Sequence, residues 1–133
     1  KKVNTLPSYT SNALWVLSFS ISCTPFFLSL KQLSLASPVS SGNKVLERLP
    51  ESLGNLTQLQ VLSLDKCKGL QCLPESIGQL TRLRSLFMRE CKCVESLPAS
   101  IGNCVNLVEV NLSKCMGLTA LPNTIAQWVH VEE

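Results

Sequence analysis

Residues 50–73 read PESLGNLTQLQVLSLDKCKGLQCL, and residues 74–97 read PESIGQLTRLRSLFMRECKCVESL. The next segment, 98–121, reads PASIGNCVNLVEVNLSKCMGLTAL. A Leu-Pro pair recurs with a constant spacing of 24, at Leu49-Pro50, Leu73-Pro74, Leu97-Pro98 and Leu121-Pro122. Matching residues at a constant period indicate an internal repeat, in which each unit buries its apolar face against its neighbours.

Each unit contains a short run of alternating apolar residues. In the first full unit, Leu59, Leu62 and Leu64 end in an L-x-L alternation, which predicts a short strand with one buried face. The same pattern recurs at Leu83, Leu86 and Met88, and again at Leu107, Val110 and Leu112. We expect eight positions per unit to point inward, at Leu53, Leu56, Leu59, Leu62, Leu64, Cys67, Leu70 and Leu73.

A helical turn is expected at the other end of each unit. Leu53 and Leu56 form an i, i+3 pair after Pro50, which predicts a short helical turn with the proline at its first position. Gly54 is expected to end that turn with a left-handed backbone, which glycine adopts easily. Glycine recurs at Gly78 and Gly102, whereas Ala126 takes this position in the last unit.

Cysteines also follow the period, at Cys67, Cys91 and Cys115. We expect them to form a file on successive strands, about 4.8 Å apart, and to serve as small buried residues. Cys72 and Cys93 lie between them, but the sequence has no C-x-x-C pair and His130 is its one histidine, so it predicts no metal site. The odd total of 7 cysteines also argues against a disulfide framework.

The pattern L-x-x-L-x-L-x-x-N/C-x-x-L over residues 49–125 resembles the leucine-rich repeat, with cysteine in place of the ladder asparagine. This resemblance implies an α/β solenoid with a 24-residue repeat, short parallel strands on its concave face and short helical turns on its convex face. The motif C-x-x-L-x-x-L-P-x-S-I-G at 67–78 is similar to the repeats of plant intracellular nucleotide-binding leucine-rich-repeat receptors, the disease-resistance proteins.

Residues 30–133 form the expected repeat domain. Its units are 30–49 with an insertion of about five residues near 37–44, then 50–73, 74–97, 98–121 and a partial unit 122–133. Residues 1–29 form a separate segment, largely uncharged, for which three interpretations stay open: a degenerate capping repeat, a signal or membrane segment, or non-native sequence. The chain begins with Lys rather than Met, so we expect a fragment of a longer protein.

Composition excludes several classes of function. With Lys+Arg 12 and Asp+Glu 9, the net charge of +3 is too small to indicate a nucleic-acid-binding protein. Hydrophobic residues make up 45% of the chain and charged residues 16%, which favours a packed core over disorder. No phosphate-binding loop, nucleophile elbow or zinc-protease motif occurs, so we expect no enzyme, no catalytic residue and no cofactor.

The strand face opposite the core is the predicted binding surface, because the curvature of a solenoid makes this face a usual docking site. Alternation directs outward Val61, Ser63, Asp65, Ser85, Phe87, Arg89, Glu109, Asn111 and Ser113. The predicted surface also includes the residues just beyond them, Lys66, Glu90 and Lys114. We expect Asp65 to neighbour Arg89. Lys66, Glu90 and Lys114 are expected to form a column of alternating charge. Phe87 is expected as an exposed aromatic anchor among polar neighbours.

The family resemblance implies a protein-recognition module, the ligand-sensing and autoregulatory repeats of a plant intracellular immune receptor. Its expected partners are a pathogen effector or a guarded host protein, together with other domains of the same longer chain. The expected location is cytoplasmic, with no membrane or nucleic-acid partner. Two alternatives stay open: a constitutive repeat scaffold that binds a small GTPase or signalling complex, and the repeat ectodomain of a secreted or membrane receptor.

Overall fold

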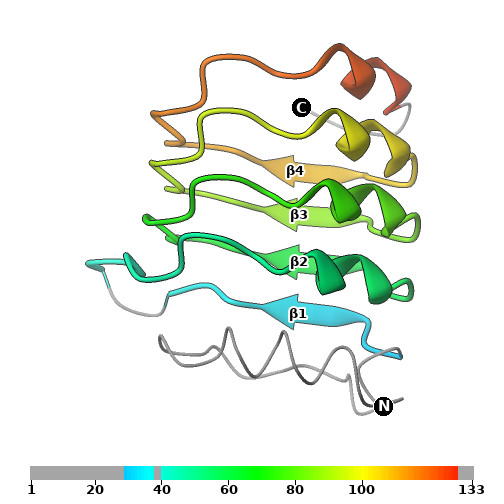
Figure 1. Cartoon of the computed structure of the whole chain (residues 1–133), viewed down its shortest axis with the longest axis horizontal. Coiled ribbons are helices and arrows are strands. Elements are labelled where there is room, and N and C mark those ends of the chain that lie inside the picture. The colour runs from blue at the N-terminus through cyan, green and yellow to red at the C-terminus, as the bar shows by residue number, and fades with distance from the viewer. Residues whose placement is uncertain (1–28, 38–39, 129–133) are drawn as a thin grey trace.

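The computed structural model describes residues 29–37 and 40–128, which form a stack of successive turns of chain (Figure 1). Each turn contributes a short strand on one side of the core and a short 3-10 helix on the other. The elements are β1 (Gln32–Ser34), η1 (Glu51–Asn55), β2 (Val61–Ser63), η2 (Glu75–Gln79), β3 (Ser85–Phe87), η3 (Ala99–Asn103), β4 (Glu109–Asn111) and η4 (Asn123–Gln127). This is the expected solenoid, with 3-10 helices as its helical turns.

The strands form one parallel sheet in the order β1-β2-β3-β4, so neighbours in the sequence are neighbours in space. Val61 of β2 is in register with Ser85 of β3, 24 positions later, as the repeat predicts. Gln32 of β1 is in register with Val61, 29 positions later. An isolated bridge between Arg48 and Cys72 restores the spacing of 24, so the five additional residues lie between β1 and Arg48.

The helical turns are 3-10 helices because their amides bond back three residues. In η2, Ile77 N donates to Pro74 O at 3.1 Å, and Leu80 N donates to Ile77 O at 3.1 Å. Pro74 has an extended backbone (φ −69°, ψ 150°) and precedes the helix, so it lies one position earlier than predicted. Five helical residues between a proline and a buried leucine leave no room for the longer hydrogen-bond ladder of an α-helix.

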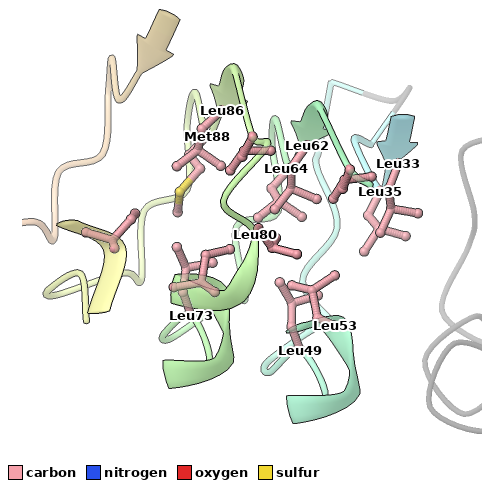
Figure 2. Packing of buried hydrophobic residues seen from close by; sticks show 14 of the residues in the cluster. Leu33, Leu35, Leu49, Leu53, Leu62, Leu64, Leu73, Leu80, Leu86 and Met88 are labelled. Carbon is pink, nitrogen blue, oxygen red and sulfur yellow. The ribbon is translucent and has the colours of Figure 1, made fainter. Parts of the chain in front are cut away.

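The core is a continuous column of leucines between the sheet and the 3-10 helices. Figure 2 shows Leu62 and Leu64 of the strand side facing Leu53 and Leu80 of the helical side. The eight positions predicted to point inward in the first full unit are all buried: Leu53, Leu56, Leu59, Leu62, Leu64, Cys67, Leu70 and Leu73. Each such side chain contributes about 1.5–3 kcal/mol when fully buried, and it gains this only with a neighbouring unit on each side.

The prediction that glycine ends each helical turn with a left-handed backbone is wrong. Gly54, Gly78 and Gly102 do not have positive φ angles. In the described residues, positive φ angles occur instead at Gly42, Lys66, Glu90 and Lys114. The turn glycines are required for close packing, since a Cβ added to Gly78 would lie 2.7 Å from the carbonyl oxygen of Ser100 in the next unit. The absence of a side chain therefore sets the distance between neighbouring turns.

The N-terminal segment remains open to all three interpretations, because residues 1–28 fall outside the part of the chain that the structure describes. Within residues 29–37 and 40–128, no helix combines the length and the apolar character that crossing a bilayer requires.

Candidate protein-binding surface

The outward side chains of β2, β3 and β4 and of the residues that follow them lie together on one side of the molecule. We call this surface the strand face. Its members are the predicted set Val61, Ser63, Asp65, Lys66, Ser85, Phe87, Arg89, Glu90, Glu109, Asn111, Ser113 and Lys114, all at least partly exposed. The intervening Leu62 and Leu86 are fully buried, so alternation along each strand separates core from surface.

Phe87 occupies the centre of the strand face. Its register partners are Ser63 on β2 and Asn111 on β4, so two polar residues flank the ring. Phe87 is half-buried rather than the exposed aromatic that the sequence predicts. Strands about 4.8 Å apart place Ser63 and Asn111 beside Phe87, so its side chain is only partly exposed.

Asp65 and Arg89 are neighbours, as predicted, but their contact differs from a side-chain ion pair. Asp65 Oδ1 accepts a hydrogen bond from the backbone N–H of Arg89 at 2.8 Å. The carboxylate thus fixes the backbone of the next unit, and the Arg89 side chain stays exposed. In the following unit, Asn111 Oδ1 accepts from Ser113 N and Oγ at 3.0 and 2.7 Å. Short polar side chains therefore hold this edge of the face in place.

The next row consists of Lys66, Glu90 and Lys114, which have φ angles of 61°, 62° and 60°. Lys114 Nζ lies 3.9 Å from Glu90 Oε1, so the predicted charge-alternating column contains at least one ion pair. The left-handed backbone turns the chain after β2, β3 and β4, and Lys66 N still donates to Arg89 O at 2.7 Å. A non-glycine residue at such an angle is strained, and here strain recurs in three consecutive units.

Cys67, Cys91 and Cys115 form the predicted file, in which Cys67 and Cys91 are buried and Cys115 is half-buried. Each of the three thiols donates a hydrogen bond to a backbone carbonyl. Burial raises the pKa of Cys67 to about 12, and burial followed by the neighbouring thiols Cys67 and Cys115 raises the pKa of Cys91 to about 12. Cys104, in the helical side of the core, has a pKa raised to about 11 by burial. These thiols are protonated at neutral pH and are poor nucleophiles. Among the described residues, no group of three or more His, Cys, Asp or Glu side chains could hold a metal ion.

A second surface feature was missed by the sequence analysis. An open groove of about 660 Å³ lies beside the inserted residues of the first unit. Lys44, Lys68 and Lys92 line it, together with the exposed thiol of Cys93. The signal was present in the sequence, since these lysines are spaced by 24, but a column of charges alone does not reveal the groove between them.

Comparison with known proteins identifies the repeat. A family model described as a leucine-rich repeat region matches residues 21–129. A comparison with curated protein sequences finds no significant match.

Several solved structures are similar to this chain. A leucine-rich-repeat protein of Leptospira interrogans is 32% identical over 82% of the chain, with a TM-score of 0.65. The leucine-rich repeat domain of the type III effector XopL is 27% identical over 74%, with a TM-score of 0.59. The plant peptide hormone receptor RGFR1, solved in complex with RGF2, is 30% identical over 80%, with a TM-score of 0.60. The match covers 26%, 31% and 16% of these three chains, so this chain spans less than a third of each.

Proposed function

Because the chain belongs to the leucine-rich repeat family, whose domains are protein–protein interaction modules, we propose that its strand face binds a protein ligand. One observation carries this proposal: the outward side chains of three parallel strands are aligned in register, in rows such as Ser63, Phe87 and Asn111. Rows on a rigid sheet present a fixed pattern of shape, charge and hydrogen-bonding groups. Such a surface recognises its ligand without paying the entropy of ordering a loop.

The composition of the strand face suits a folded protein ligand better than a small molecule. Phe87 supplies a partly exposed aromatic side chain at the centre, and the surrounding side chains supply both charge signs. Central aromatic residues surrounded by polar ones resemble the hot spots of protein interfaces. Lys44, Lys68 and Lys92 line a groove, and no member of the strand face contributes to it, so the groove and the strand face are separate surfaces.

We further propose that the chain is the ligand-sensing repeat fragment of a plant intracellular immune receptor. The sequence motif C-x-x-L-x-x-L-P-x-S-I-G at 67–78 supports this assignment. The ligand would be a pathogen effector or a guarded host protein, and the repeats would also contact other domains of the same longer chain. Binding that favours one arrangement of those domains would shift an intramolecular equilibrium by the difference in affinity for the two arrangements.

The thiols support a cytoplasmic location within this proposal. In the described residues, six cysteines are free, and Cys72 and Cys93 are exposed. Exposed free thiols persist in a reducing compartment, whereas secreted proteins tend to pair them. The file of hydrogen-bonded thiols also depends on the reduced state, since only the S–H form donates.

A second candidate is the repeat ectodomain of a membrane or secreted receptor. The 30% identity to the plant peptide hormone receptor RGFR1 favours this candidate. Expression of the full-length protein with a fluorescent tag separates the two, because the cytoplasmic receptor stays inside the plasma membrane and the ectodomain is accessible to an external protease.

The strand-face proposal is tested with Phe87→Glu in a two-hybrid panel of pathogen effectors and plant host proteins. A partner of the wild-type chain should lose binding by about 30-fold or more, because a charge replaces the central aromatic residue. Val105→Glu is the matched control, since Val105 is exposed and lies outside the strand face. Circular dichroism should be unchanged for both variants. Partners that bind Phe87→Glu as tightly as wild type would refute the assignment of the strand face.

A further inference from the structure

Ser41 and Lys44, which belong to the inserted stretch of the first unit, form one wall of a groove. We call it the insertion groove, and its lining includes Ser41, Lys44, Glu47, Lys68, Lys92 and Cys93. In Figure 1 the cyan loop after β1 extends beyond the corresponding loops of the later turns. No residue of the strand face lines the groove, so it is a separate surface.

The wall is held against the second unit by several hydrogen bonds. Asn43 N donates to Lys66 O at 2.9 Å, and Gly69 N donates to Asn43 O at 3.0 Å. The Asn43 side-chain oxygen accepts from the amides of Val45 and Leu46 at 2.9 and 3.1 Å. Each bond contributes about 0.5–1.5 kcal/mol, so Asn43 is fixed both to the residues that follow it and to the neighbouring unit. The groove is therefore organised before any ligand arrives.

The charge of the insertion groove is unbalanced. Lys44, Lys68 and Lys92 occupy the same position in consecutive units, and Glu47 is the one acidic residue in the lining. Lys68 Nζ donates to Ser40 O at 3.0 Å, a neutral partner. Within the described ranges, none of the three ammonium groups lies within ion-pair distance of a carboxylate. Like charges on neighbouring units repel one another, and an anionic ligand would relieve that repulsion.

The arrangement of the three lysines in the groove favours an extended peptide over a compact anion as the ligand. The lysines form a row along the stack rather than converging on one point, because each belongs to a different unit. No arginine lines the groove, so it lacks the planar fork that suits phosphate. An extended peptide directs every second side chain to one side, with a spacing of about 6.6–6.8 Å. Neighbouring strands are about 4.8 Å apart, and the long lysine side chains span the difference, so separate carboxylates meet separate lysines.

We propose that the insertion groove binds an acidic segment of a protein partner, in extended conformation, through Lys44, Lys68 and Lys92. The strand face takes no part in this contact. The two surfaces are therefore separable by mutation, and failure of one proposal leaves the other standing.

The first test uses a fluorescent peptide of alternating Glu and Ser, with a Gln and Ser peptide as the uncharged probe. The combined change Lys44→Gln, Lys68→Gln and Lys92→Gln should weaken binding of the Glu peptide about ten-fold or more, because three contacts are lost. The control combines Lys31→Gln, Arg82→Gln and Arg84→Gln, which removes the same charge from exposed positions near the opposite ends of the strands. That control should change binding less than about two-fold, as should Phe87→Glu.

The second test uses the two exposed thiols and needs no lysine variant. Cys93 lines the groove and Cys72 does not, so the bound Glu peptide should slow maleimide labelling of Cys93 and leave labelling of Cys72 unchanged. Mass spectrometry of the digested protein separates the two sites. Equal weakening by both triple variants, or unprotected Cys93, would overturn the proposal.

Two further probes separate other anions from an acidic peptide. Inorganic phosphate at equal concentration should not displace the Glu peptide, and vesicles of phosphatidylserine and phosphatidylcholine should bind both triple variants equally. Displacement by phosphate would assign the groove to a phosphate group. Vesicle binding that depends on Lys44, Lys68 and Lys92 would assign it to a lipid surface. Either result would replace the peptide proposal.

Discussion

The Cys91 thiol donates a hydrogen bond of 3.1 Å to the backbone carbonyl of Leu64 in the preceding turn. Cys115 makes the equivalent bond to Met88 at 2.9 Å, and Cys67 makes it to Leu35 at 3.3 Å, across the unit that carries the insertion. The cysteine file therefore links each turn to the one before it. In a solenoid, where each unit contacts only its neighbours, such links contribute directly to the interface between units.

Replacing Cys91 by Ala should reduce the free energy of unfolding by about 1–3 kcal/mol. The lost sulfur leaves a small cavity in the core, and Leu64 O retains only the amide of Cys67 as its partner. Urea unfolding followed by circular dichroism measures the change. Cys93→Ala is the matched control, because Cys93 is exposed, and it should change the free energy by less than about 0.5 kcal/mol. Equal effects of the two variants would contradict the role of the file.

Stability should fall at alkaline pH because of the buried thiols. The pKa of Cys67 and of Cys91 is raised from 9.0 to about 12 in the folded chain, so between these values the folded state binds more protons than the unfolded state. The contribution is complete below about pH 9 and is lost as pH rises toward 12, at no more than about 1.4 kcal/mol per pH unit for each thiol.

Urea unfolding between pH 7 and about pH 10.5 tests this dependence. The slope of the unfolding free energy against pH above 9 should be shallower in Cys91→Ala than in the wild-type chain, since one thiol no longer titrates on unfolding. Comparing the two chains cancels the titration of lysine and tyrosine. A slope unaffected by the substitution would show that Cys91 ionises equally in both states.

Replacing Gly78 by Ala should destabilise the chain by about 1–3 kcal/mol through overpacking. The added Cβ would lie 2.7 Å from Ser100 O and 2.9 Å from Ser100 Cβ, so two neighbouring turns must separate. Thermal unfolding measures the change. Gln79→Ala lies in the same 3-10 helix with an exposed side chain and should have little effect. If Gly78→Ala melts at the wild-type temperature, close packing does not explain the glycine.

The left-handed backbone at Glu90 predicts an unusual order of substitutions. Glu90→Gly should be nearly neutral, because relief of backbone strain offsets the flexibility that glycine adds to the unfolded chain. Glu90→Val should cost about 1–2 kcal/mol or more, since a β-branched residue tolerates φ of 62° poorly. Both variants lose the contact with Lys114, which is worth at most about 1 kcal/mol. The difference between their free energies of unfolding therefore reports the effect of the backbone angle.

Arg89→Val and Arg89→Gly supply the comparison for Glu90, because Arg89 is exposed and has no positive φ angle. Here the order should reverse, with Gly less stable than Val, because without a positive φ angle glycine only adds flexibility to the unfolded chain. Chemical unfolding of the four variants gives both differences. The same order at both positions would mean that the backbone angle at Glu90 does not set the preference.

The strand face shows where prediction from sequence ends. Alternation correctly directed Phe87 outward, because the two-residue period of a strand needs no knowledge of its neighbours. Its half-buried state depends on Ser63 and Asn111, which lie 24 residues away on either side. The contact between Asp65 and the Arg89 amide likewise depends on how the chain turns after each strand.

By itself the amino-acid sequence determined the 24-residue period, the buried leucines and the cysteine file, because each follows from a pattern that repeats along the chain. Only the tertiary structure decided that Glu90, not Gly78, adopts the left-handed backbone and that Lys44 and Lys68 border one groove. These features arise from contacts between successive turns. A local sequence pattern specifies which side chains seek burial, whereas the distance and orientation of the neighbouring turn decide which backbone angles and surface groups must adjust.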